Sequence, residues 1–92
     1  MTISLRGWIQ RTMNKQIVKA IGNNIRRLRE RKGITQELLA THLQLKGLDI
    51  TRSAVAKIEV GQRHLYPDEI LYIRDILGVS FDDIFAYEDQ IT

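Results

Sequence analysis

Apolar residues recur at helical spacing in several segments of the chain. In the first segment they fall every three or four positions and predict a helix from Gln16 or Ile17 to Lys32, with Gly33 as its stop. The stripe consists of Ile17, Ile21, Ile25 and Leu28. A second helix is expected from Gln36 to about Lys46–Gly47, capped by Thr35. Its apolar residues are Leu38, Leu39, Leu43 and Leu45.

The segment from Thr51 to Gly61 predicts a third helix with two different faces. Val55 and Ile58 fall on one side of a 3.6-residue period, whereas Ser53 and Lys57 fall on the opposite side. Thr51 is expected to cap the helix, and Gly61 is expected to end it. The outward residues are small or cationic, which allows a close approach to an anionic partner: Arg52, Ser53, Ala54, Ala56 and Lys57.

Two shorter helices are expected after this segment. Pro67 suits the first position of a helix that Gly78 stops. Ser80 and Asp83 resemble a capping box for a final short helix. The residues expected to face the core are Ile70, Ile73, Ile76, Leu77, Phe81, Ile84 and Phe85. With no strand alternation, the pattern predicts an all-α fold, a compact five-helix bundle around one core.

The 92 residues suit a single domain. We expect a loosely ordered N-terminal arm at 1–15, a helical domain at 16–87 and a short acidic tail at 88–92. Whether Trp8 and Ile9 pack on the domain or on a partner stays open at this point.

The net charge of +3 conceals two unlike parts. Residues 1–66 hold 13 Lys and Arg against 4 acidic residues, or +9, whereas residues 67–92 hold Arg74 against 7 acidic residues, or −6. A basic face of this kind is typical of phosphate binding, because each neutralised phosphate releases condensed counterions. A membrane surface is disfavoured, since no basic amphipathic helix presents a strong apolar face and no apolar run is long enough to span.

Composition argues against several other classes. The chain has no cysteine, which excludes disulfides and thiolate metal sites and fits a cytoplasmic protein. The two histidines, His42 and His64, lie far apart in sequence and have no metal-binding companion at helical spacing. We therefore expect no enzyme activity, no metal and no cofactor.

Three segments in order resemble the phage-repressor and Cro-type (XRE-like) helix-turn-helix family: residues 21–40, 51–61 and 67–85. The resemblance runs from about Ile17 to Phe85, and it implies a lambda-repressor-like DNA-binding domain. In that family the second helix of the motif enters the major groove of double-stranded DNA, and dimers bind two half-sites about one helical turn apart.

The resemblance implies specific roles for individual residues. Base contacts are expected from Arg52, Ser53, Ala54 and Lys57. Phosphate contacts are expected from Thr35, Gln36, Thr51, Gln62 and Arg63. The resemblance also implies a structural salt bridge between Arg29 and Glu59, which the helical angle of Glu59 supports independently.

Two departures from the family pattern matter. Gln36 and Thr51 are 15 positions apart, about five more than in the compact motif, so either the first helix is longer or the turn is a real loop. Val60 stands before Gly61, where the family often has a polar residue that touches phosphate. We expect that contact to be absent.

The function expected is a sequence-specific transcriptional regulator, a repressor, that binds DNA as a homodimer. Ile84, Phe85 and Tyr87 are candidates for the dimer surface. The alternative is a protein-interaction module of the same fold, such as an antitoxin or an adaptor, whose acidic C-terminal end binds a protein partner.

Overall fold

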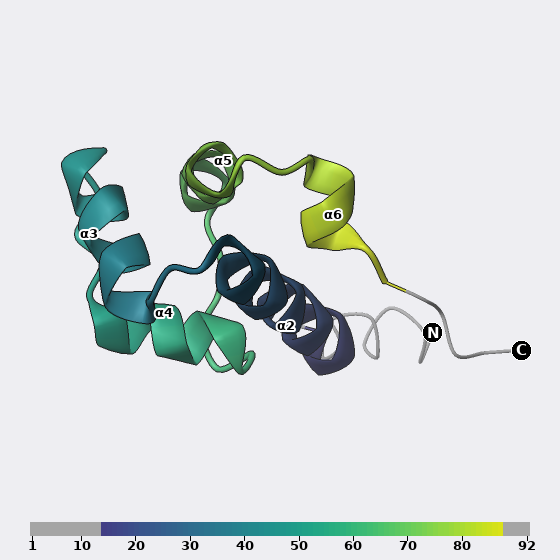
Figure 1. Cartoon of the computed structure of the whole chain (residues 1–92). Coiled ribbons are helices and arrows are strands. Elements are labelled where there is room, and N and C mark those ends of the chain that lie inside the picture. Colours follow the sequence, from purple (N-terminus) through teal and green to yellow (C-terminus); the bar gives the residue numbers. More distant parts are fainter. Residues whose placement is uncertain (1–13, 88–92) are drawn as a thin grey trace, which may run out of the picture.

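The computed structural model describes residues 14–87, which form five α-helices around one core (Figure 1). The all-α prediction is confirmed for this part of the chain. The helices are α2 (Lys15–Lys32), α3 (Gln36–Leu45), α4 (Arg52–Glu59), α5 (Pro67–Leu77) and α6 (Phe81–Phe85). Most of the expected arm, with Trp8 and Ile9, and the expected acidic tail lie outside the described residues. Within those residues, no helix is long and apolar enough to cross a membrane.

Side-chain caps set the starts of four helices. Thr35, Thr51 and Ser80 accept hydrogen bonds from backbone N–H groups in the first turns of α3, α4 and α6, as expected. Asn14 was not expected as a cap, yet its side chain accepts from the backbone N–H groups of Gln16 and Ile17, both at 3.1 Å. α2 therefore begins at Lys15, slightly earlier than the apolar stripe indicated.

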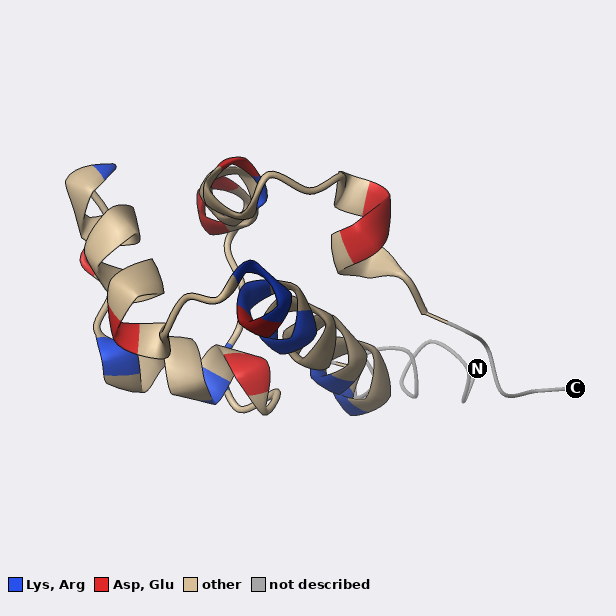
Figure 2. Cartoon of the chain, viewed as in Figure 1, with Lys and Arg blue, Asp and Glu red and all other residues tan. Residues whose placement is uncertain are grey.

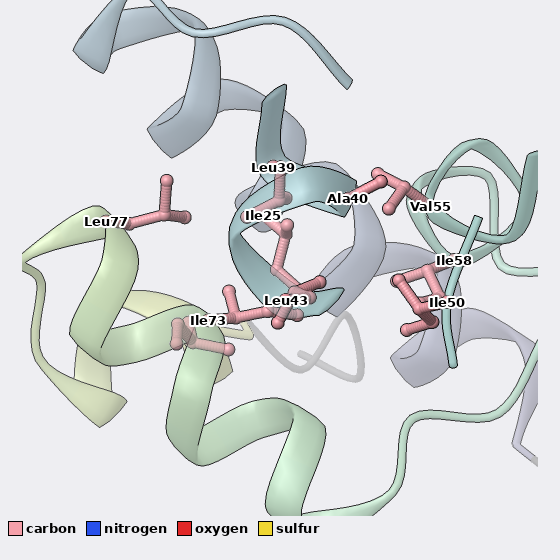
Figure 3. Close-up of a cluster of buried hydrophobic side chains, with 10 residues drawn as sticks. Ile25, Leu39, Ala40, Leu43, Ile50, Val55, Ile58, Ile73 and Leu77 are labelled. Atoms are coloured by element: carbon pink, nitrogen blue, oxygen red, sulfur yellow. The ribbon is translucent and has the colours of Figure 1, made fainter. Parts of the chain in front are cut away.

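The core draws on every helix and on the α3–α4 connector (Figure 3). α4 packs against both α2 and α3, while α5 packs against α3 and α6 against α2. The fully buried large side chains are Ile25, Leu39, Leu43, Ile50, Val55, Ile58, Ile73 and Ile84. This arrangement seats the buried side of α4 and leaves its opposite side in solvent.

Several large apolar residues are exposed, including two that were expected to face the core. Leu38 and Leu45 lie on the outer side of α3, and Leu45 is 79% exposed. Phe81 and Phe85 are 39% and 43% exposed, so the expectation that both turn inward was wrong. α6 is a single short turn that directs only Ile84 into the core, and the two phenylalanine rings pack on each other with centroids 6.4 Å apart. Because Ile84 is fully buried, it is also excluded as a dimer-surface residue.

The long spacing between Gln36 and Thr51 is now explained. α3 has ten residues and ends at Leu45, so residues 46–51 form a real loop. Gly47 adopts a positive φ of 95°, and the backbone N–H of Leu48 donates to the carbonyl oxygen of Leu43 at 3.1 Å. The side chain of Gln44 then donates to the carbonyl oxygen of Ile50 at 2.7 Å. The extra residues are thus fixed in place, and Thr51 still caps α4.

The two parts of opposite charge in the sequence occupy different helices. Figure 2 shows basic residues gathered on α2 and α4 and acidic residues on α5 and α6. Asn24 ties these two regions together, because its side-chain amide donates to the carbonyl oxygens of Ile84 (2.9 Å) and Ala86 (2.8 Å).

Candidate nucleic-acid interface

The exposed side of α4 carries two cationic side chains and a hydroxyl. Arg52, Ser53 and Lys57 are exposed, whereas Val55 and Ile58 are buried on the opposite side. Among the described residues, neither Arg52 nor Lys57 forms an ion pair. Their charges are therefore available to an outside anion.

Both alanines of α4 were expected to face outward, and both are half-buried in the structure. Ala54 packs partly against the core, which reduces the surface it can offer to a base. Ala56, four positions after Arg52, lies at the helical angle between Arg52 and Ser53. By this angle Ala56 lies between the exposed Arg52 and Ser53, although its side chain is half-buried, and both alanines allow a close approach.

A buried ion pair fixes α4 relative to α2. Arg29 and Glu59 are only 7% and 4% exposed, and the Arg29 guanidinium donates to both carboxylate oxygens, Nε to Oε2 at 2.7 Å and Nη2 to Oε1 at 3.1 Å. The hydrogen bond with Glu59 raises the pKa of Arg29 above its ordinary value. Arg29 also donates to the carbonyl oxygen of Ile34 at 2.8 Å, so the pair anchors the α2–α3 turn as well.

The start of α3 joins this network. The Gln36 side-chain amide donates to Glu59 Oε1 at 3.0 Å. The side-chain amide of Gln36 is therefore already used inside the protein. The backbone N–H groups of Gln36 and Glu37, by contrast, have no partner among the described residues. Such free N–H groups, together with the helix dipole, favour a bound anion. Next to them an open pocket is lined by Arg29, Thr35, Gln36, Glu37 and Arg52.

Arg63 is engaged differently from the expected phosphate contact. Its two terminal nitrogens each lie 2.9 Å from a carboxylate oxygen of Glu69, and Nη1 also donates to the carbonyl oxygen of His64. Glu69 is buried at the start of α5. The structure therefore favours a role for Arg63 in fixing the α4–α5 loop. Gln62, by contrast, is exposed beside the end of α4.

The Arg63–Glu69 pair makes stability depend on pH. Burial alone would raise the pKa of Glu69, but hydrogen bonds from Arg63 and from the backbone N–H of Tyr66 outweigh it and lower that pKa. A depressed carboxylate pKa gives stability that is present above the unfolded value of about 4.3 and is lost as the pH falls through the folded value. We expect Glu69→Gln to reduce the free energy of unfolding by about 1–3 kcal/mol at neutral pH. Urea denaturation should show this deficit shrinking below about pH 4.

Asp75 provides the matched control, because it pairs with Arg74 on the exposed side of the same helix. Asp75→Asn should change stability by less than about 1 kcal/mol at any pH. Parallel acid-denaturation curves for wild type and Glu69→Gln would contradict the assignment to Glu69.

Sequence reasoning did not identify three side chains that shape the interface. Gln44 and Asn24 make buried or half-buried hydrogen bonds to backbone carbonyls, and Glu69 holds Arg63. Asn24 could have been suspected, because it lies next to Ile25 and three positions after Ile21 at the edge of the apolar stripe. The partners of Gln44 and Glu69 are set by loop conformations that leave no periodic signal.

Taken together, two helices joined by an ordered loop, with the second presenting an exposed cationic side, define a helix-turn-helix domain. The helix-turn-helix family model matches residues 25–84, well over half of the chain, and the chain belongs to this family of DNA-binding regulators. The match confirms the XRE-like helix-turn-helix resemblance. Comparisons with curated proteins and with solved structures give no match.

Proposed function

We propose that this protein is a sequence-specific transcriptional regulator, a repressor, that binds double-stranded DNA as a homodimer with α4 in the major groove. One observation carries the proposal. The side of α4 opposite the core presents Arg52, Ser53 and Lys57 to solvent, while the buried Arg29–Glu59 pair fixes the orientation of that helix. A rigidly held helix with free donors on one side suits base reading.

The chemistry of the exposed side suits specific base pairs. Arg52 or Lys57 donates to guanine O6 and N7, the commonest specific contact in the major groove. Ser53 serves several bases, since its hydroxyl both donates and accepts. Ala54 and Ala56 keep the helix surface shallow, and either methyl group suits contact with a thymine methyl.

Phosphate contacts would come from the two ends of this motif. The caps Thr35 and Thr51 use their oxygens to accept backbone N–H groups, which leaves each hydroxyl hydrogen to donate to a phosphate. At the start of α3, the free backbone N–H groups of Gln36 and Glu37 can donate to a phosphate. After α4, the exposed side-chain amide of Gln62 can do the same. These contacts set register and do not read sequence.

Selection of DNA sites from a random pool tests the proposal. A two-fold symmetric site with half-sites about 10 base pairs apart would support both direct reading and a dimer. A salt titration on the selected duplex and on a scrambled duplex should then show steep salt dependence for both and tighter binding of the selected site. Enrichment of no site would contradict the proposal.

Arg52→Ala should weaken binding to the selected duplex by about 1–3 kcal/mol and relax preference at one base pair in each half-site. The physical reason is the loss of a charged donor from the exposed side of α4. Arg31→Ala removes the same charge from an exposed position on α2, on the side facing α6, and serves as the control. Equal effects of the two changes on base preference would show that Arg52 does not read bases. Titrations of each variant against single-base-pair variants of the site supply the measurement.

The exposed pair Phe81 and Phe85 on the acidic α6 favours a second candidate, a protein-interaction module. That function predicts partner binding that is indifferent to Arg52→Ala and to the salt concentrations that dissociate DNA. The same two measurements therefore separate the candidates.

A further inference from the structure

An open groove runs between residues 16–26 of α2 and the end of α4. It has a volume of about 590 Å³, and we call it the α2–α4 groove. Its lining consists of Gln16, Lys19, Ala20, Asn23, Arg26, Glu59, Val60 and Tyr87. No base or phosphate contact expected from the sequence lies in it.

Two glycines bring α2 and α4 unusually close along this groove. A Cβ on Gly22 would overlap the carbonyl oxygen of Ile58 and lie 2.9 Å from that of Glu59. A Cβ on Gly61 would lie 2.9 Å from the Cα of Lys19. The backbones are therefore in direct contact, and side chains of α2 near Gly22 border the end of α4.

Lys19 and Arg26 are three positions before and four positions after Gly22, so they share its side of the helix. Both are exposed, and both line the groove. The side-chain amides of Gln16, which precedes Lys19, and of Asn23, which lies between Lys19 and Arg26 in sequence, also line the groove. The groove thus has cations and neutral donors along one wall.

Within residues 14–87, the acidic groups near the groove leave this charge available. Glu59 is buried, and both of its oxygens already accept hydrogen bonds from Arg29 or Gln36. Glu30 lies 3.3 Å from Arg26, but both side chains are more than half exposed, and such a surface pair is weak.

The basic residues on the other side of α2 lie near acidic groups. Arg27 donates to Asn24, and a smaller pocket lined by Arg27, Arg31 and Asp83 faces the acidic α6. A phosphate approaching there would meet a carboxylate. The basic residues of α2 are therefore divided into one set beside α4 and another set beside α6.

The α2–α4 groove is continuous with the exposed side of α4. Val60 is half exposed, belongs to the groove lining and lies within about 60° of both Ser53 and Lys57 around the helix axis. A helix in the major groove, about 12 Å wide, is bordered by the two phosphate backbones. The pocket at the start of α3 includes Arg52, the first residue of α4, whereas the α2–α4 groove includes Glu59 and Val60 at the end of α4.

From this geometry we propose that the α2–α4 groove is a second binding site for the DNA phosphate backbone. Lys19 and Arg26 supply the charge, and Gln16 and Asn23 donate from their amides. Val60 adds no donor, since valine has no polar side-chain atom, so these four donors all come from α2. The inference rests on the proposed function, because it requires α4 to lie in the major groove.

The test compares two double variants of the full chain that remove the same two charges. Lys19→Gln with Arg26→Gln empties the groove of cations. Lys32→Gln with Arg31→Gln is the matched control, because Arg31 lines the pocket beside α6 and the Lys32 amine lies near Gly78 at the end of α5. The measured quantity is affinity for the selected duplex and for a scrambled duplex between about 50 and 200 mM salt, a range over which affinity that depends on phosphate contacts falls steeply.

Loss of two phosphate contacts makes the slope of log affinity against log salt shallower by about 1.8. Raising the salt across this range should therefore reduce the affinity of wild type about 10-fold more than it reduces the affinity of the groove variant. The control should keep the wild-type slope, and base preference should be unchanged in both. Equal slopes for the two double variants would overturn the inference while leaving the proposed function intact. If wild type itself selects no site, the proposed function fails first. Thermal denaturation by circular dichroism checks that both variants are folded.

Discussion

Replacing Glu59 by leucine is expected to lower the free energy of unfolding by about 3–5 kcal/mol. The change leaves the guanidinium of Arg29, which is 7% exposed, buried without its carboxylate. A small domain has only about 5–15 kcal/mol of stability, so the variant should be marginally folded at room temperature. Urea denaturation followed by circular dichroism measures the loss.

Two further variants separate the ion pair from general effects of removing a glutamate. Glu30→Gln breaks the exposed pair with Arg26 and should cost less than about 1 kcal/mol. Arg29→Met combined with Glu59→Leu removes both buried charges, and it should recover much of the stability lost in Glu59→Leu. If the double variant were no more stable than Glu59→Leu alone, packing rather than charge would explain the effect.

The same pair has a consequence for binding. Glu59 is on α4, Arg29 is on α2 and Gln36 is at the start of α3, so one carboxylate holds three helices in register. The Arg29→Met, Glu59→Leu variant is expected to keep a folded core and to lose these directional bonds. Sequence preference depends on holding Arg52 and Lys57 at fixed positions relative to the phosphate contacts.

Sequence patterns predicted those features that depend on local chemistry. Caps such as Thr51 and Ser80 and stops such as Gly78 act on neighbouring backbone groups, so the residue type and spacing are sufficient. Helical periodicity likewise predicted the inward-facing stripe of α2, which is buried at Ile25 and half-buried at Ile21 and Leu28, and the exposed side of α4. Asn14 could have been recognised as a cap on the same grounds.

Contacts distant in sequence were predicted only where the family resemblance supplied them, as for Arg29 and Glu59, and the others could not be predicted. Phe81 and Phe85 are as apolar as Ile84, and only the position of α6 against α2 decides that Ile84 alone is buried. Arg63 resembles any basic loop residue until the fold places Glu69 beside it. The α2–α4 groove likewise depends on how closely two helices approach.

At Gly22, helix propensity and the tertiary structure predict opposite signs for the stability change caused by substitution with alanine. Glycine inside a helix is less stable than alanine by up to about 1 kcal/mol, so propensity alone predicts that Gly22→Ala stabilises the protein. In the structure, however, the missing Cβ is the space that the carbonyl oxygens of Ile58 and Glu59 occupy. These obstacles are backbone atoms, which cannot move aside as a flexible side chain can.

Gly22→Ala is therefore expected to destabilise the protein by about 3 kcal/mol, at the upper end of overpacking effects, despite its higher helix propensity. Asn23→Ala is the control, because it is exposed on the same helix and should be neutral or stabilising by up to about 0.7 kcal/mol. Urea denaturation of the two variants measures the difference, and stabilisation by Gly22→Ala would show that α2 and α4 separate at little cost. Because α4 must shift away from α2 to accept the methyl group, the folded fraction of Gly22→Ala should also bind the selected duplex more weakly. Asn23→Ala, which removes one neutral donor of the α2–α4 groove, should retain most of the wild-type affinity.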